Sequence, residues 1–383
     1  MSRYRRLLMN TINHLSVKYH GRVVGTLAKT AKGLGAFQYS REWLADGFSI
    51  SPFSLPLESR VFMPKSYTLE GLFGVFADSL PDGWGRLLVD RMLLSMHISP
   101  ADISAVNRLA IVGSNGMGAL EYFPEMLQMK EPDVLDFDRL SKECEKILKE
   151  ETSEDLDTLF LLGGSSGGAR PKVLITYEGE PWIVKFPSSY DKKDIGEEEY
   201  LYMQCAEQCG ILVPQIHLFS SKNCKGYFGV RRFDRKQGKK IHMITASGLL
   251  ETSHRIPNLD YHDLMKLTYL LTKDMREIEE LYRRMCFNVF AHNRDDHSKN
   301  FSYYYDEDEA GWKLTPAYDL TYSSSLMGEH ATCVNGNGKD PGMKDLLAVG
   351  KAAGLEERKI KTIAEEIKEI TFSNLKNSFN STS

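Results

Sequence analysis

The chain has few cysteines, and none of them is paired at the spacing of a metal site. Its 383 residues include six, at positions 144, 205, 209, 224, 286 and 333. None forms a Cys-x-x-Cys pair, and the closest two, Cys205 and Cys209, have helical spacing. This pattern argues against a disulfide framework or a zinc site and predicts a reduced intracellular protein with buried thiols.

Long apolar runs are missing as well. No segment approaches the roughly 20 apolar residues that a membrane-spanning helix needs. The first residues, Met1–Arg6, are basic, but Asn10, Asn13 and His14 interrupt the stretch behind them, so it does not form the apolar core of a secretory signal. We therefore expect a cytoplasmic protein with no membrane contact.

Neither charge sign is in large excess, and we find no internal repeats. The formal net charge of −4 gives no sign of a protein that binds nucleic acid along its whole length. With 42% hydrophobic and 26% charged residues, the composition is that of an ordinary globular protein. The length allows two or three domains with ample cores.

The first part of the chain reads as a small α+β module. Alternating apolar residues over 15–27, with a turn at 20–22, predict a β-hairpin. Further strands are expected at 36–39 and at 54–57. Residues 70–96 then change to helical periodicity, which Leu80-Pro81-Asp82-Gly83 interrupts.

Beyond this module the pattern predicts a connector helix and a mainly helical second half. An apolar stripe at helical spacing over 135–150 indicates the connector. Similar stripes predict single helices at 194–209 and 355–371 and two consecutive helices within 261–292. The expected parts are an N-terminal subdomain over 1–125, the rest of a first lobe over 126–235, a helical lobe over 236–376, and a frayed tail over 377–383.

The segment Asn293–Asn300 is the most informative in the chain. Asp295 stands five positions before Asn300, which is the spacing of the catalytic loop of kinases. Phosphoryl transfer needs a carboxylate at the attacking hydroxyl and oxygen ligands for magnesium. An isolated Asp-x-x-x-x-Asn is weak, because both residues are common in loops.

The residues that follow strengthen this interpretation. Phe301–Tyr305 and Trp312–Leu314 are predicted to pair as a hairpin. Such a hairpin can bring Asn300 and Asp319 to the same end of a sheet, where one cation could bridge them.

A glycine-rich loop, Gly163–Lys172, lies upstream. One interpretation is a flexible linker. The other is a backbone nest that holds phosphates through N–H groups. It is not a Walker loop, and it lacks a clean G-x-G-x-x-G. Its place directly before a predicted hairpin, whose second strand carries Lys185, favours the phosphate loop.

Lys185 stands between Val184 and Phe186, which face away from it if the segment is a strand. It is either a lysine with its stem on an edge strand and its ammonium in water, or a kinase lysine that pairs with phosphates and with a helix glutamate. Glu197–Glu199 open the next predicted helix and offer such a partner. Acidic residues also simply stabilise a helix start.

Two further groups have competing interpretations. Arg231–Arg235 is either a solvated charge cluster or the hinge that supplies backbone groups to adenine, with Asp234 reaching ribose hydroxyls. His292 and His297 flank Asp295 and Asp296, as in a histidine–aspartate metal site. Such sites need more ligands from separate helices, and the remaining histidines have no motif spacing. His297 could equally brace the loop or contact phosphate.

The order of these parts is that of a bilobal kinase: Gly-rich loop, strand lysine, helix acid, hinge, Asp…Asn, hairpin, Asp. We therefore predict an α+β, bilobal kinase-like fold with an N-terminal α+β subdomain and a mainly helical C-terminal lobe. Tyr318-Asp319-Leu320 replaces the usual Asp-Phe-Gly, which indicates a divergent kinase.

Over nearly its whole length the chain resembles the HipA-like serine/threonine kinases, which are toxins of bacterial toxin–antitoxin pairs. The segments that look like the family's N-terminal subdomain are Gly21–Leu27, Ser54–Leu57, Leu80–Gly83 and Gly118–Leu120. Those that look like its kinase core are Gly168–Lys172, Phe233–Arg235, Asp295–Phe301 and Leu314–Leu320.

The resemblance implies a role for each matching residue. Asp295 would be the proton acceptor, and Asn300 and Asp319 the Mg²⁺ ligands. The family phosphorylates itself on a serine of the glycine-rich loop, which matches Ser165, with Ser166 beside it. The implied ATP contacts are Gly167, Gly168, Ala169, Arg170, Pro171, Lys172, Lys185, Arg231, Arg232, Phe233, Asp234, His297, Ser298, Lys299, Asn300 and Tyr318.

The resemblance also implies partners. They are a helix-turn-helix, HipB-like antitoxin, DNA reached mainly through that antitoxin, and a translation protein such as an aminoacyl-tRNA synthetase as substrate. Two other functions stay open at this point. One is a weakly active or inactive co-repressor that binds the antitoxin, and the other is a small-molecule phosphotransferase.

Overall fold

The computed structural model describes residues 12–126, 136–189, 191–325 and 328–380, with side chains as far as residue 376. The basic start, Met1–Arg6, lies outside these ranges, as do the last three residues of the predicted tail. Two compact units make up the chain. The first comprises Met1–Lys193, Phe219–Ile244 and Gly248–Thr252, and the second comprises Asp194–Leu218, Thr245–Ser247 and Ser253–Ser383. The predicted boundaries at residues 125, 235 and 376 are finer than this division and stay predictions.

A five-stranded antiparallel sheet forms the start of the first unit. Its order is β4-β3-β2-β1-β5, with strands at His14–Tyr19 (β1), Arg22–Lys29 (β2), Gly35–Tyr39 (β3), Val61–Phe62 (β4) and Leu120–Phe123 (β5). The predicted hairpin is therefore confirmed. His20 and Gly21 both have positive φ in its tight turn, the geometry that suits a two-residue hairpin loop.

The prediction of a strand at Ser54–Leu57 is wrong. In the structure this stretch makes an isolated bridge between Ser51 and Leu55, and the strand that joins the sheet is Val61–Phe62. Pro56 interrupts the alternating pattern because it has no N–H to give to a ladder. Leu55 is fully buried all the same, whereas Leu57 is exposed.

Short helices complete the N-terminal part. They are Arg41–Asp46 (α2), Gly74–Ala77 (α3), Gly83–Ser95 (α4), the 3₁₀ turn Pro100–Asp102 and Ala105–Val112 (α5). The predicted interruption near residue 80 is confirmed, since α3 ends at Ala77. The Asp82 side chain accepts a hydrogen bond from the Gly83 nitrogen and so caps α4.

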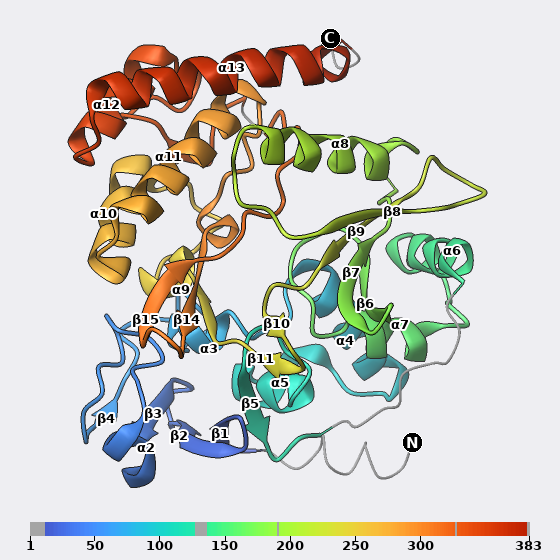
Figure 1. The fold of residues 1–383 in the computed structure, drawn as a ribbon. Helices are drawn as coiled ribbons and strands as arrows, with labels where there is room; N and C mark the ends of the chain where they lie inside the picture. The colour runs from blue at the N-terminus through green and yellow to red at the C-terminus, as the bar shows by residue number, and fades with distance from the viewer. Residues whose placement is uncertain (1–11, 127–135, 190, 326–327, 381–383) are drawn as a thin grey trace. The chain divides into compact units, whose positions relative to one another are not determined.

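The remainder of the first unit carries β6, β7 and β9 of a second sheet, whose strand order is β6-β7-β9-β8 (Figure 1). Its strands are Lys172–Tyr177 (β6), Glu180–Lys185 (β7), Ile216–Phe219 (β8) and Tyr227–Arg231 (β9). The helices before it are Phe137–Leu148 (α6), which is the expected connector, and Leu156–Gly163 (α7), which packs on α4 and β6. Because β6 starts directly after the glycine-rich loop, the sheet fixes one end of that loop.

Helices dominate the second unit. They are Ile195–Gln208 (α8), Tyr261–Thr272 (α10), Met275–Phe290 (α11), Met343–Ala352 (α12) and Glu357–Asn380 (α13). The two helices predicted within 261–292 meet at Lys273, which is left-handed, and Asp274 caps the second. The last helix runs further than the predicted 355–371. Its inner face packs against α8, α11 and α12.

The predicted hairpin of the second unit is confirmed as Ser302–Asp306 (β14) and Gly311–Leu314 (β15). The remaining short elements are Arg235–Lys236 (β10), Lys239–Lys240 (β11), Met243–Thr245 (β12), Ala246–Leu249 (α9), Leu259–Asp260 (β13) and Thr332–Cys333 (β16). Across the described ranges, no helix is both long and apolar enough to cross a membrane.

Candidate active site

The predicted catalytic loop follows α11 in the second unit. The helix ends at Phe290 with Ala291 as its C-cap, and a short 3₁₀ turn at Ser298–Asn300 closes the loop before β14. The two adjacent aspartates differ sharply: Asp295 is exposed, whereas Asp296 has no exposed surface. The exposed carboxylate is therefore the one that a substrate hydroxyl can approach.

Asp296 is fixed by a buried polar network. Its carboxylate accepts hydrogen bonds from the Tyr261 hydroxyl at 2.9 Å, the Thr332 nitrogen at 3.2 Å and His330 Nδ1 at 3.0 Å. Asn288 donates to the same Tyr261 hydroxyl at 2.9 Å. Burial, together with the neighbouring Asp296 charge, raises the pKa of Tyr261 well above its usual value, so its hydroxyl stays a donor. This network braces the backbone next to Asp295.

A second tie joins the loop to the segment after the hairpin. The Tyr318 hydroxyl donates to the Lys299 carbonyl at 2.6 Å and also hydrogen bonds to the Ser302 hydroxyl. Asn300 follows Lys299, and Asp319 follows Tyr318. The structure thus brings together the two ends that the sequence assigned to one cation.

The conformations of the two candidate magnesium ligands are defined by a side-chain hydrogen bond at Asn300 and by a backbone angle at Asp319. The Asn300 amide nitrogen donates to the Asp295 carbonyl at 2.7 Å, which turns the amide oxygen away from that carbonyl. Asp319 is half-buried and has φ of 53°, a left-handed conformation that Asp and Asn tolerate better than most residues. Within the described residues, no group of three or more His, Cys, Asp or Glu side chains is arranged to hold a metal. The predicted magnesium site has only two protein ligands, and it stays a prediction.

His297, Ser298 and Lys299 lie between these points. His297 is half-buried, and its ring lies 5.2 Å from the His254 ring, centroid to centroid. Its Nδ1 atom is buried and has no hydrogen-bond partner among the residues that the structure describes. Such an orphaned atom fits a phosphate oxygen or a bound water. Ser298 is 5% exposed, so its side chain faces the interior.

In the first unit, two lysines face each other at the end of the glycine-rich loop. Lys172 of β6 and Lys185 of β7 are direct cross-strand partners, so their side chains lie on the same face of the sheet. The Lys172 ammonium donates to the Gly167 carbonyl at 2.6 Å, and that of Lys185 lies 5.6 Å from the Phe228 ring centroid. Like charges directly opposite repel, and this arrangement fits an anion such as the phosphates of ATP.

The other residues of the loop differ in their contacts and in their exposure. Arg170 forms an ion pair with Asp191 at 3.3 Å, while Gly167, Gly168 and Ala169 are exposed. Val184 and Phe186 are buried on either side of the half-buried Lys185. The predicted alternation along this strand is therefore confirmed.

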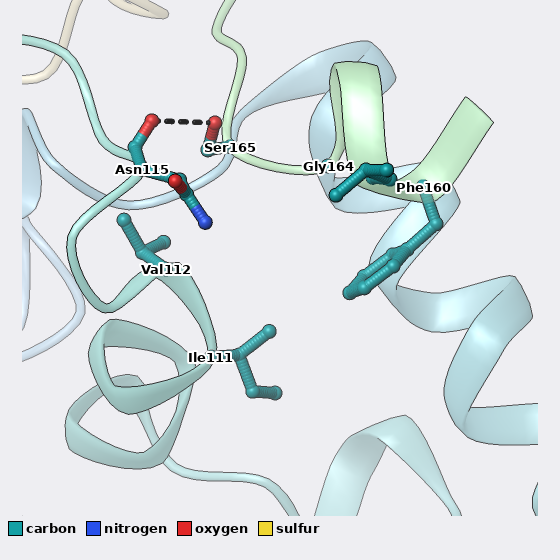
Figure 2. A pocket seen from close by; sticks show the side chains of 7 residues that line it. Ile111, Val112, Asn115, Phe160, Gly164 and Ser165 are labelled. Atoms are coloured by element: carbon teal, nitrogen blue, oxygen red, sulfur yellow. Dashed lines mark hydrogen bonds between the residues drawn. The ribbon is translucent and has the colours of Figure 1, made fainter. Parts of the chain in front are cut away.

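The two candidate serines have different surroundings. Ser165 is half-buried, and its hydroxyl donates to the Asn115 carbonyl at 2.9 Å; Figure 2 shows this bond beside Gly164 and Phe160. Ser166 is 2% exposed, and its hydroxyl donates to the Gly163 carbonyl at 2.5 Å. Ser165 is thus the more accessible of the two.

The predicted hinge contains an internal charge network. Asp234 is 1% exposed and accepts hydrogen bonds from Arg232, from Arg235 and from the Gly118 nitrogen, all at 2.7 to 2.9 Å. Burial opposes ionisation of Asp234, but the two arginines outweigh it and lower its pKa to about 2. Burial also lowers the pKa of Arg235, to about 10. The predicted ribose contact would require Asp234 to leave these partners.

The neighbouring arginines are also engaged. Arg231 pairs with Glu180 at 2.7 Å, and the Arg232 backbone nitrogen donates to the Pro181 carbonyl at 2.9 Å. Phe233 is half-buried. The adenine contact predicted for this hinge would therefore rest on backbone groups other than the Arg232 N–H.

Two domains of one protein family match the chain, one after the other along the sequence. The HipA N-terminal domain matches residues 15–123, and the HipA-like C-terminal domain matches residues 164–374, which is more than half of the chain. The chain belongs to the HipA-like family. The second match begins inside the glycine-rich loop and continues through the catalytic loop to α13.

Two relatives of the chain are named as putative kinases. Putative kinase Y4mE of Sinorhizobium fredii is 27% identical over 344 residues, which cover 81% of this chain and 77% of the relative. A putative kinase of Haemophilus influenzae is 27% identical over 181 residues, or 41% of this chain and 52% of the relative.

A solved structure shows the HipA-like fold. It is a chain from the Shewanella oneidensis MR-1 toxin–antitoxin complex of HipA, HipB and operator DNA. The two chains share 17% identity and superpose with a TM-score of 0.71 over 96% of this chain and 91% of that one. The likeness confirms the predicted α+β, bilobal kinase-like fold.

Sequence reasoning missed the residues that brace this HipA-like site. Asp296 was visible only as a second aspartate, and its partners Tyr261 and His330 had no motif. The one available signal was the Asp-Asp pair itself, because two adjacent loop carboxylates rarely serve the same purpose. Trp84, which contacts the glycine-rich loop, was not identified either.

Proposed function

We propose that this HipA-like protein is an ATP- and Mg²⁺-dependent serine/threonine protein kinase that acts as the toxin of a toxin–antitoxin pair. The observation that carries the proposal is the braced catalytic loop. Asp295 is exposed beside the buried Asp296, and the Tyr318 hydroxyl ties together the segments that bear Asn300 and Asp319. The putative kinases among its relatives support this function.

Asp295 is the proposed proton acceptor. The hydroxyl oxygen of a serine or threonine attacks the γ-phosphorus of ATP, and the bond from that phosphorus to the bridging oxygen breaks to release ADP. The hydroxyl proton passes to the Asp295 carboxylate. Asn300 and Asp319 would hold magnesium, which would supply positive charge to offset that of the phosphates.

The first unit is proposed to bind the phosphates of ATP. Lys172 and Lys185 provide two cations on one face of the sheet, and the exposed glycines of the loop allow backbone N–H groups to approach an anion closely. Lys185 is proposed as the phosphate-binding lysine of the family.

Self-inhibition is proposed to act through Ser165. Its accessible hydroxyl, in contrast to the buried one of Ser166, favours it as the modified residue. A phosphoserine there would add roughly two negative charges to a site that suits the phosphates of ATP, and these charges would repel the nucleotide.

The proposed partners follow from the solved relative, which was crystallised with HipB and operator DNA. We propose a helix-turn-helix antitoxin as the direct partner, with DNA contacted mainly through it. A translation protein such as an aminoacyl-tRNA synthetase is the proposed substrate.

The test is incubation of the purified protein with Mg-ATP, followed by intact-mass measurement and peptide mapping. We expect one added phosphate on Ser165 in the wild type and in Ser166→Ala, and none in Ser165→Ala. Asp295→Asn should slow its appearance by about 10²- to 10⁴-fold, because a general base is lost.

Two other outcomes would redirect the proposal. If the protein binds the antitoxin but neither binds ATP nor transfers phosphate with any divalent metal, it is a co-repressor and the kinase assignment fails. If it phosphorylates added sugars or aminoglycosides but no protein, it is a small-molecule phosphotransferase.

A further inference from the structure

A short segment of the N-terminal part, Pro81–Gly85, lies against the glycine-rich loop within the first unit. The Trp84 backbone nitrogen donates to the Gly168 carbonyl at 2.9 Å, and the Asp82 nitrogen donates to the Ser166 carbonyl at 3.3 Å. Two carbonyl groups of the loop are thereby fixed by residues far upstream in the sequence.

The side chain of Trp84 ties down the end of the same loop. It is 1% exposed, and its indole nitrogen donates to the Lys172 carbonyl at 3.0 Å. The Lys172 ammonium in turn donates to the Gly167 carbonyl. Lys172 is thus held by its backbone while its side chain holds the middle of the loop.

The contact is so close that only glycine fits at two positions. A Cβ on Gly83 would lie 2.3 Å from the Gly168 carbonyl oxygen, and one on Gly85 would lie 2.2 Å from that of Ser166. Gly83 also has positive φ, of 46°, whereas Gly85 does not. The need for glycine at position 85 is therefore purely steric: any side chain there would push the loop away.

We propose that Pro81–Gly85 is a brace that holds the glycine-rich loop in the conformation that binds the nucleotide. Gly83, Trp84 and Gly85 are then positioning residues for ATP, although none of them belongs to the loop. This inference rests on the proposed kinase function, and it assigns to the N-terminal subdomain a part in forming the ATP site.

A brace of this kind acts on binding more than on turnover. An ordered loop presents its N–H groups without first losing conformational freedom, so ATP binds more tightly. The residues proposed for proton transfer lie elsewhere in the chain. Loss of the brace should therefore raise KM for ATP and leave kcat nearly unchanged.

Three variants test the brace. Gly85→Ala introduces the steric conflict without backbone strain. Trp84→Phe removes the indole donor and keeps a large aromatic ring. Gly33→Ala is the control, because Gly33 lies in the same unit and has nothing within 4 Å of its added Cβ; its φ of 80° adds backbone strain that Gly85→Ala does not have.

We expect backbone amides of residues 163–172 to exchange hydrogen about tenfold faster in Gly85→Ala and in Trp84→Phe, as the loss of about one loop hydrogen bond implies. Affinity for Mg-ATP, measured by calorimetry, should fall by about the same factor. Gly33→Ala should change neither quantity, even if it lowers the melting temperature.

The brace is refuted if loop exchange in both test variants equals that of the wild type, or if it rises no more than exchange across the whole first unit. The exchange measurement needs no nucleotide. A wild type that fails to bind ATP would therefore overturn the proposed function, while the exchange data would still decide whether the segment orders the loop.

Discussion

The two functional loops of this HipA-like protein are held in place by different physical means. The catalytic loop depends on side chains: Asp296 is buried and accepts hydrogen bonds from Tyr261 and His330. The glycine-rich loop depends on backbone hydrogen bonds and on close packing of Gly83 and Gly85. The catalytic loop is held mainly by a buried carboxylate, and the glycine-rich loop by close backbone contacts at glycines together with the Trp84 indole.

This difference determines which changes each loop tolerates. A buried carboxylate with three donors is sensitive to loss of charge and insensitive to small changes of volume nearby. At Gly83 and Gly85 an added methyl carbon would lie only 2.3 and 2.2 Å from a carbonyl oxygen, so this contact is sensitive to a single carbon and insensitive to charge. A substitution that removes a charge should therefore disturb the catalytic loop most. A substitution that adds one carbon should disturb the glycine-rich loop most.

The largest effect is expected at the adjacent aspartates. Asp296→Asn removes the charged acceptor from a buried network and should lower the free energy of unfolding by about 4 kcal/mol. Asp295→Asn, at an exposed position, should change it by less than about 0.5 kcal/mol. Urea unfolding of both variants measures the difference. Equal losses would show that Asp296 does not brace the loop.

A somewhat smaller effect is expected at the hinge, where a charge network stands in the same unit as the glycine-rich loop. Asp234→Asn should lower the free energy of unfolding by about 3 kcal/mol at pH 7. The folded pKa of Asp234, about 2, lies below the ordinary value of 3.8, so its ionised form contributes stability above pH 4. That contribution is lost as the pH falls through about 2.

The difference in free energy of unfolding between the wild type and Asp234→Asn should therefore stay constant from pH 7 to about pH 5 and become smaller towards pH 2. Urea unfolding at several pH values follows it. A gap that is the same at pH 7 and near pH 2 would contradict the assignment of the ionised carboxylate as the stabilising form.

The smallest effect is expected at Tyr318. Tyr318→Phe removes the hydroxyl that ties Lys299 to the segment before Asp319, and it should raise the magnesium concentration for half-maximal activity by about tenfold. Tyr303→Phe is the control, since Tyr303 lies in β14 of the hairpin before Tyr318 and its buried hydroxyl bonds to Thr268 of α10. It should lower stability without changing the magnesium dependence.

Much of the framework could be predicted from the sequence because it depends on local patterns. The hairpins at residues 14–29 and 302–314 follow from alternation and turn residues. The expected junction of two helices within 261–292 coincides with a left-handed Lys273 and a capping Asp274. The strand expected at Ser54–Leu57 failed because Pro56 cannot donate to a ladder, and of its two leucines only Leu55 is buried.

The braces could not be predicted, because their partners are distant in sequence. Asp296 is bonded to residues 34 and 35 positions away. Trp84 bonds to a carbonyl 88 positions away. Only the folded backbone brings such groups together, and neither Tyr261 nor Trp84 belongs to a spacing motif. Gly85 has no positive φ, so even its local conformation gave no signal.

The left-handed backbone of Asp319 has a practical consequence for anyone who removes this carboxylate. Alanine there would combine the loss of the carboxylate with a backbone penalty of about 1 kcal/mol, because it lacks the short polar side chain that helps Asp and Asn to adopt that conformation. Asparagine adopts the left-handed region readily and has nearly the same shape. Asp319→Asn is therefore the substitution that silences the residue chemically while it leaves the main chain undisturbed.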